Sequence, residues 1–132
     1  MTLKELSQFR DLKREIINIE RKIAELEDEA TDTSAKITGM PHSGKLGDKI
    51  GSIVSQIDYY ESIQKKRLAE CESELNCLNE YISACPDSLT RQILEYRFID
   101  GMKWNQVAEK IGGTSEYAVK KITYRYIKKR IN

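Results

Sequence analysis

The most regular feature of the chain is a run of apolar residues near its N-terminus that recur in steps of three and four. The run comprises Phe9, Leu12, Ile16, Ile19, Ile23, Leu26 and Ala30. This spacing forms one stripe of a helix, the a/d seam of a coiled coil, over about three heptads. The pattern predicts a helix from about Leu3 to Ala30, whose stripe must pack against another helix to leave water.

The segment from Thr31 to Gly47 has no hydrophobic period and is rich in Ser, Thr and Gly. It is predicted to be a flexible connector. Its sequence GMPHSGK superficially resembles a phosphate-binding loop, but Leu46 follows Lys45 where Ser or Thr is required, and no buried strand precedes it. We therefore expect no phosphate site in this segment.

A second long helix is predicted from about Asp48, which would be its N-cap, to Ala84. Its apolar residues fall into two heptad registers. These are Ile50, Ile53, Ile57 and Tyr60 in the first, and Leu68, Cys71, Leu75, Leu78 and Ile82 in the second. The eleven-residue step from Ile57 to Leu68 predicts a stutter that locally unwinds the supercoil at Gln64. Cys71 would be a small core residue rather than a reactive thiol.

The two long helices can pair in two ways. Joined by a connector, they most simply form an antiparallel hairpin within one chain, and they can equally pair with the helices of a second chain. We expect a homodimer through the long helices, in which the stripe of the first helix forms the interface. The interface residues would then be Phe9, Leu12, Ile16, Ile19, Ile23 and Leu26.

Pro86 ends the second helix, and shorter helices are predicted to follow. Asp87 or Ser88 would cap the first of these, and Gly101 would end it. No strand-like alternation is present, so the expected fold class is all-α: a long coiled-coil helical hairpin followed by a compact three-helix domain. The expected domains are residues 1–85, with a flexible loop at 31–47, and residues 86–132.

The stretch WNQVAEKIGGTSEYAVKKI, Trp104 to Ile122, predicts a helix-turn-helix. Gly112 and Gly113 would break the first helix, and Thr114 or Ser115 would cap the second. The second helix is expected at residues 115–131, with an extra residue in the turn that moves its first inward position by one. The residues expected to fill the space between the helices are Val107, Ile111, Val119 and Ile122. Ala108 would be small because the second helix crosses close above it, and Tyr126 and Ile127 would continue the buried side of that helix.

The net charge of +1 hides an uneven distribution of charge along the chain. Residues 1–85 carry 12 Lys and Arg against 16 Asp and Glu, a net of −4, whereas residues 101–132 carry 8 against 2, a net of +6. A basic C-terminal part behind an acidic N-terminal part is typical of a module that binds a polyanion such as nucleic acid.

Other classes of chemistry are poorly represented. The three cysteines form no CxxC, and the single histidine, His42, lies in the predicted connector, so no metal site is expected. No nucleophile, base or carboxylate pair indicates an enzyme, and no cofactor is expected. No apolar run is long enough to cross a membrane. An odd number of cysteines without a signal peptide is typical of the reducing cytoplasm.

The outward face of the last helix carries the candidate DNA contacts. The N-terminal residues of a recognition helix reach base edges in the major groove, and those expected here are Glu116, Tyr117, Lys120 and Lys121. Residues around them would contact phosphates of double-stranded DNA. These are Thr114, Ser115, Tyr124, Arg125, Lys128, Lys129 and Arg130. The alternative is an ordinary solvated basic face.

The stretch LEYRFIDGMKWNQVAEKIGGTSEYAVKKITYRYIKK resembles the region 4 DNA-binding module of sigma-70-type transcription factors. With the N-terminal LKELSQFRDLKREI, nearly the whole chain resembles the small phage and prophage regulators of the ArpU and RinA type. The resemblance implies a cytoplasmic transcriptional regulator of phage late genes, with RNA polymerase as a second partner. The chain has no room for the promoter-melting domain of a complete sigma factor.

Two other functions remain open from the sequence. A small terminase-like DNA-packaging subunit also combines a helix-turn-helix with a helical hairpin, but forms a ring of eight or more copies rather than a dimer. A coiled-coil interaction scaffold would use the long helices alone, and its C-terminal helix would bind nothing.

Overall fold

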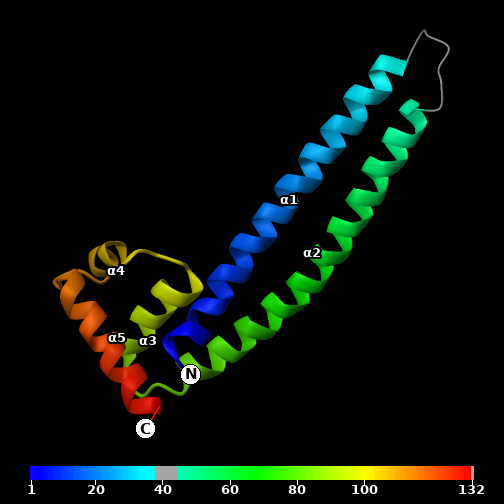
Figure 1. The fold of residues 1–132 in the computed structure, drawn as a ribbon. Helices are drawn as coiled ribbons and strands as arrows, with labels where there is room; N and C mark the ends of the chain where they lie inside the picture. The colour runs from blue at the N-terminus through cyan, green and yellow to red at the C-terminus, as the bar shows by residue number, and fades with distance from the viewer. Residues whose placement is uncertain (38–44, 132) are drawn as a thin grey trace. The chain divides into compact units, whose positions relative to one another are not determined.

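The computed structural model describes residues 1–37 and 45–131, with side chains described for 1–33 and 47–130, and all regular structure in these ranges is helical (Figure 1). The elements in chain order are α1 (Leu3–Ile37), α2 (Lys45–Ser83), α3 (Ser88–Leu94), the π-helix η1 (Glu95–Ile99), α4 (Trp104–Ile111) and α5 (Glu116–Ile131). The all-α fold class with a long helical hairpin is therefore confirmed.

Both long helices extend into the segment 31–47, so the prediction of a flexible connector was wrong at its two ends. Thr33 shows how the polar residues are accommodated, because its hydroxyl donates to the carbonyl of Glu29 at 2.8 Å and is satisfied within the helix. Extending an existing helix also costs far less than nucleating a new one. Residues 38–44, which include His42, lie outside the described residues.

The start of α2 also differs from the prediction. The helix begins at Lys45, so Asp48 lies inside its first turn instead of capping it. A carboxylate in the first turn still interacts favourably with the positive end of the helix dipole. The predicted end is close to the observed one, since α2 stops at Ser83, shortly before Pro86.

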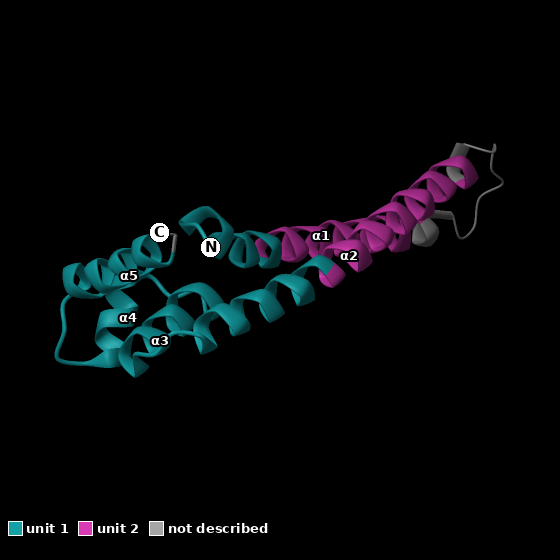
Figure 2. Cartoon of the chain, turned by 90° about the horizontal axis from the view of Figure 1, so that it is seen from below, with its two compact units in different colours: residues 1–13, 70–132 teal, residues 14–69 magenta. Residues whose placement is uncertain are grey.

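The contacts group the chain into two compact units (Figure 2). Unit 1 consists of Met1–Lys13 and Glu70–Asn132, and unit 2 of Arg14–Ala69. The predicted boundary between residues 85 and 86 falls inside unit 1. Unit 1 therefore contains the first turns of α1 and the last part of α2 together with all the shorter helices.

Unit 2 is an antiparallel pair formed by α1 and α2 of the same chain (Figure 2). The Arg67 guanidinium donates to the Glu15 carboxylate at 2.9 Å, and the Gln64 amide donates to the Glu20 carboxylate at 3.4 Å. As the residue number rises on α1 it falls on α2, which is the mark of an antiparallel pair. Of the two pairings left open by the sequence, the structure has the one within the chain.

The seam of α2 runs without the predicted stutter. Its inward positions continue in steps of four and three from Ile53, which is buried, through the half-buried Gln64 and Arg67 to Cys71. Leu68, assigned to the stripe by the sequence, is instead 49 % exposed. The prediction was wrong because two seam positions, Gln64 and Arg67, are polar, and in the sequence they look like a break in the apolar pattern. In the structure both side chains pair with carboxylates of α1.

The core of unit 1 joins residues from opposite ends of the chain. Leu6 and Phe9 of α1 pack in one buried cluster with Leu78 of α2, Phe98 of η1 and Ile127 of α5. The cluster is completed by Tyr81, Ile82 and Leu94, and the half-buried Cys71 packs at its edge. Burial raises the pKa of the Cys71 thiol and the charge of Lys13 lowers it, with burial the larger effect, in line with its predicted role as a small core residue.

The residues that were expected at a dimer interface lie inside a single chain. Phe9, Leu12, Ile16 and Ile19 are between 4 % and 7 % exposed, and the other two, Ile23 and Leu26, are half-buried. This stripe has little exposed area left for a second copy. A homodimer formed through these side chains would have to open the hairpin first.

Candidate nucleic-acid interface

The end of α4 is shaped by two glycines with positive φ. Gly112 has φ 78° and ψ 145°, and Gly113 has φ 67°. The N–H of Gly112 donates to the carbonyl of Ala108 at 3.0 Å, which closes the last turn of the helix. Side chains other than glycine are strained in this part of conformational space, so the glycine pair fixes where α4 ends.

The start of α5 is fixed by a serine cap. The Ser115 hydroxyl accepts a hydrogen bond from the N–H of Ala118 at 3.1 Å. Of the two predicted caps, Thr114 and Ser115, the second therefore has the capping geometry. Residues 112–115 form the connection, which accommodates the extra residue inferred from the sequence.

The residues between α4 and α5 are buried largely as predicted. Val107 and Val119 are completely buried and Ala108 is 7 % exposed, whereas Ala118 is only half-buried. The inward position therefore falls on Val119, one residue later than in the common spacing. The same cluster contains Ile93 and Trp104, with Ile111 and Ile122 half-buried beside it. Thr123, which the hydrophobic pattern missed, is fully buried. Its hydroxyl is satisfied because it donates to the carbonyl of Val119 at 2.9 Å.

The helix before the turn changes its winding at η1. The N–H of Asp100 donates to the carbonyl of Glu95, a bond that spans five residues and marks a π-helix. This wider turn shifts every later side chain around the axis. Because a period of 3.6 residues does not hold here, Tyr96 and Arg97 are both half-buried and neither is fully inward.

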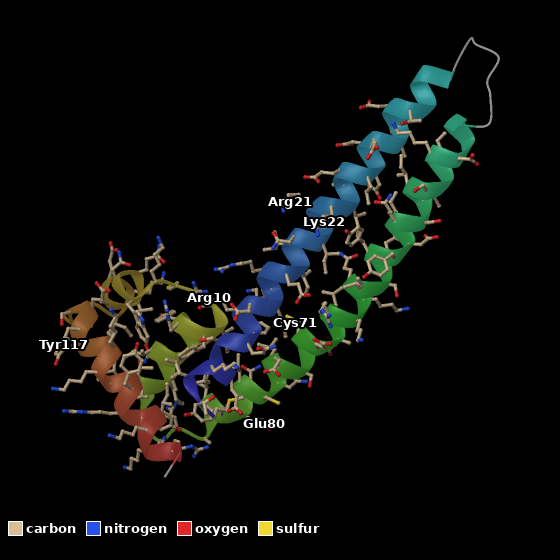
Figure 3. All side chains as sticks on the ribbon, viewed as in Figure 1. Arg10, Arg21, Lys22, Cys71, Glu80 and Tyr117 are labelled. Atoms are coloured by element: carbon tan, nitrogen blue, oxygen red, sulfur yellow. The ribbon has the colours of Figure 1, made fainter. Side chains whose placement is uncertain are left out.

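The four predicted base-contacting residues lie together at the N-terminal end of α5. Tyr117 is 72 % exposed and points away from the other helices (Figure 3). Lys121 holds its Nζ 5.8 Å from the centre of the Tyr117 ring. Glu116 and Lys120 are 3.4 Å apart in an exposed ion pair. Such a pair contributes little to stability and is readily exchanged for other partners.

Most of the predicted phosphate-contacting residues surround this group. Among the described residues, none of the cations Arg125, Lys128 and Lys129 is in an ion pair, and all three are exposed. Tyr124 is 46 % exposed, and its ring centre lies 6.0 Å from that of Trp104 in an edge-to-face contact. Thr114 is half-buried and Ser115 is exposed at the turn.

Arg130 differs from its neighbours because its guanidinium has partners within unit 1. Its Cζ lies 5.2 Å from the centre of the Tyr81 ring and 6.0 Å from that of the Tyr126 ring. Cations stack favourably over aromatic faces at this distance. The sequence grouped Arg130 with the phosphate contacts, whereas its contacts here attach the end of α5 to the end of α2.

A shallow groove of about 350 Å³ runs along the exposed face of α5. It is lined by Tyr117, Lys120, Lys121, Tyr124, Arg125 and Lys128. The structure therefore brings three predicted base contacts and three predicted phosphate contacts onto one surface. Tyrosine rings form its apolar part, and lysine and arginine side chains provide the positive charge around them.

Sequence reasoning missed Arg97. Its Nη1 donates to the carbonyl of Met102 at 2.9 Å, and its Cζ lies 4.5 Å from the centre of the Trp104 ring. Burial lowers the pKa of Arg97, the charge of Arg10 lowers it further, and Tyr124 opposes the effect. The π-helix that positions this side chain has no recognisable sequence signal, so periodicity could not have identified it.

Other kinds of site are less well supported. Within residues 1–37 and 45–131, no three His, Cys, Asp or Glu side chains are grouped so that they could hold a metal ion. None of the helices in that part of the chain is both long and apolar enough to cross a membrane. The chain matches no protein-family model, no curated protein and no solved structure.

Proposed function

We propose that this protein is a transcriptional regulator that binds double-stranded DNA sequence-specifically, with α5 in the major groove. The observation that carries the proposal is the exposed face of α5, where tyrosine rings and four cations line one groove next to a glycine-shaped turn, and among the described residues only Lys120 of these cations is in an ion pair. The sequence from Glu116 to Ile131 has six basic residues and one acidic residue. A helix of this charge, supported from behind by α3 and α4, suits entry into a polyanionic groove.

The chemistry of the N-terminal turn of α5 favours direct reading of bases. Lysine donates to guanine O6 and N7, and glutamate accepts from cytosine N4, so Lys120, Lys121 and Glu116 together suit a G·C pair. The ring of Tyr117 offers an apolar surface to a thymine methyl group. The ion pair between Glu116 and Lys120 is exposed and costs little to break, so both side chains can exchange it for contacts to bases.

The rest of the face favours contacts to the DNA backbone. Arg125, Lys128 and Lys129 are free to meet phosphates, and Thr114, Ser115 and Tyr124 offer hydroxyl donors beside them. With the two lysines at the start of the helix, about five phosphates would be neutralised per chain. The binding constant should then fall with salt with a log–log slope near −4.5.

The test compares two double variants that remove the same charge. Lys120→Ala/Lys121→Ala removes two lysines from α5, and Lys65→Ala/Lys66→Ala removes two exposed lysines from α2. Binding to a duplex selected from a random pool should be lost in the first variant and kept in the second. Equal losses in both variants would mean that only overall charge matters, and the proposal would fail.

The selected sequence also tests the wider role. From the resemblance to phage regulators, we propose late promoters as the target and RNA polymerase as a second partner. A palindromic site would indicate two cooperating copies, and a single asymmetric box would indicate docking beside polymerase. Because the stripe from Phe9 to Leu26 is covered within the chain, a dimer would use another surface.

A further inference from the structure

A second group of cations lies outside the face of α5. Arg97 of η1 is held by its hydrogen bond to the Met102 carbonyl and by its stack on Trp104 at 4.5 Å. The Trp104 ring also makes an edge-to-face contact with Tyr124, which belongs to the groove on α5. Arg97 is therefore an oriented guanidinium next to the proposed DNA surface, and only one of its five N–H donors has an acceptor among the described residues.

The core of unit 1 joins the helix that carries Arg10 to the π-helix that carries Arg97. Phe9 and Phe98 pack in one buried cluster, and Arg10 and Arg97 are their neighbours in the sequence. Arg10 lies on the side of α1 that faces the shorter helices (Figure 3). Burial lowers the pKa of Arg97, and the charge of Arg10 lowers it further. Among the described residues, neither arginine forms an ion pair with a carboxylate.

Arg10 and Arg97 are half-buried like charges on elements that share the core of unit 1, so they repel one another, and an anion bound by both would remove that repulsion. Guanidinium groups are planar forks that match the oxygens of a phosphate, and Arg97 is already fixed in orientation. We propose that Arg10 and Arg97 form a phosphate-binding site that takes a backbone phosphate of the duplex entered by α5. The first helix of the hairpin would then be part of the DNA interface. This inference rests on the proposed function of α5.

The test measures the salt dependence of duplex binding in variants of Arg10. Arg10→Ala should make the log–log slope shallower by about one unit, because one phosphate contact is lost. It should weaken binding roughly tenfold for every sequence alike, the size expected for one hydrogen bond to a charged group. Arg10→Lys should restore the slope but not the full affinity, since lysine keeps the charge and loses the fork.

The matched control is Arg21→Ala, which removes an arginine further along the same helix. Arg21 is exposed and faces Glu25 at 3.9 Å, so it already has a partner. The salt slope and the duplex affinity of Arg21→Ala should equal those of the unchanged protein. Thermal unfolding of each variant shows whether weaker binding comes from a lost contact or from a lost fold. Arg10 is half-buried and is not part of the core, so we expect Arg10→Ala to keep its fold.

A titration with inorganic phosphate identifies the source of the anion. We expect the side-chain N–H signals of Arg97 to shift with phosphate in the unchanged protein and much less in Arg10→Ala. If phosphate shifts these signals while Arg10→Ala keeps the full salt slope, the site takes free phosphate and the assignment to DNA is wrong. If neither measurement responds to Arg10→Ala, there is no phosphate site at all.

The lysine variants keep this failure separate from failure of the proposed function. Loss of duplex binding in Lys120→Ala/Lys121→Ala with an unchanged slope in Arg10→Ala would leave α5 as the DNA reader and remove only the arginine site. A protein that binds no duplex would overturn both proposals.

Discussion

The guanidinium of Arg130 lies 5.2 Å over the ring of Tyr81, so the last turn of α5 is fastened to the last turn of α2. The Tyr81 ring in turn meets the Tyr126 ring edge-on at 5.7 Å. Two aromatic residues and one cation thus hold the proposed recognition helix against the hairpin. The orientation of α5 depends on residues far from its exposed face.

Arg130→Ala should therefore reduce stability rather than remove a phosphate contact. The loss should be about 1 kcal/mol, from the stacked cation and its packed stem. A fall in Tm of about 4 °C would be expected, while the salt slope of duplex binding stays the same. Lys129→Ala is the control and should behave in the opposite way, with a shallower slope and an unchanged Tm.

Tyr81→Phe should stabilise the protein. The Tyr81 side chain is 6 % exposed, and its hydroxyl has no hydrogen-bond partner among the described residues. Removing an unsatisfied buried hydroxyl should raise the free energy of unfolding by about 1 kcal/mol, since the ring under Arg130 remains. Chemical denaturation measures the change, and a loss of stability would reveal a partner for the hydroxyl.

Gly112→Ala should destabilise the turn between α4 and α5. No atom lies within 4 Å of an added Cβ, so the cost is that of the backbone angles alone, about 1–3 kcal/mol. Gly51→Ala is a matched control, because Gly51 lies inside α2 and its added Cβ also meets open space. That variant should gain about 0.5–1 kcal/mol, and changes of the same sign in both would contradict the turn geometry.

The register of α2 can be tested with two leucines. Leu78 is completely buried, so Leu78→Ala should lower the free energy of unfolding by about 2–5 kcal/mol. Leu68 is 49 % exposed, and Leu68→Ala should lower it by less than about 1 kcal/mol. A stutter at Gln64 would instead make both substitutions costly.

The cap of α3 should make stability depend on pH in acid. Asp87 accepts hydrogen bonds from the Thr90 hydroxyl at 2.6 Å and the Thr90 N–H at 3.1 Å, and these bonds lower its pKa. A lowered folded pKa means that the stabilisation is complete above the ordinary carboxyl value of about 3.9 and is lost as the pH falls through the folded value.

Asp87→Ala should therefore lower Tm at neutral pH, and the difference from the unchanged protein should shrink as the pH falls below about 4. Asp87→Ser keeps an acceptor for the Thr90 N–H but has no carboxyl group. It should retain part of the stability and show no such acid dependence. A difference that stays constant down to acid pH would contradict the link to the carboxylate.

The sequence predicted what periodicity and turn residues determine: the helices, the glycine turn and the buried positions Val107 and Val119. It did not predict the polar part of the hairpin seam, because Gln64 and Arg67 look like a break until their partners on α1 are known. It also missed Arg97, whose position depends on a π-helix. The stack of Arg130 on Tyr81 joins residues far apart in the chain, and no local pattern reports such a contact.

The sharing of one core by Leu6, Phe9 and Ile127 has a consequence for biosynthesis. A ribosome makes Leu6 and Phe9 long before Ile127, so the core of unit 1 cannot close until Ile127 has been made. Until then, the side chains of Leu6 and Phe9 are only partly buried. Nascent chains with exposed apolar side chains attract chaperones. A product that ended before Ile127 would lack the part of α5 on which that core depends.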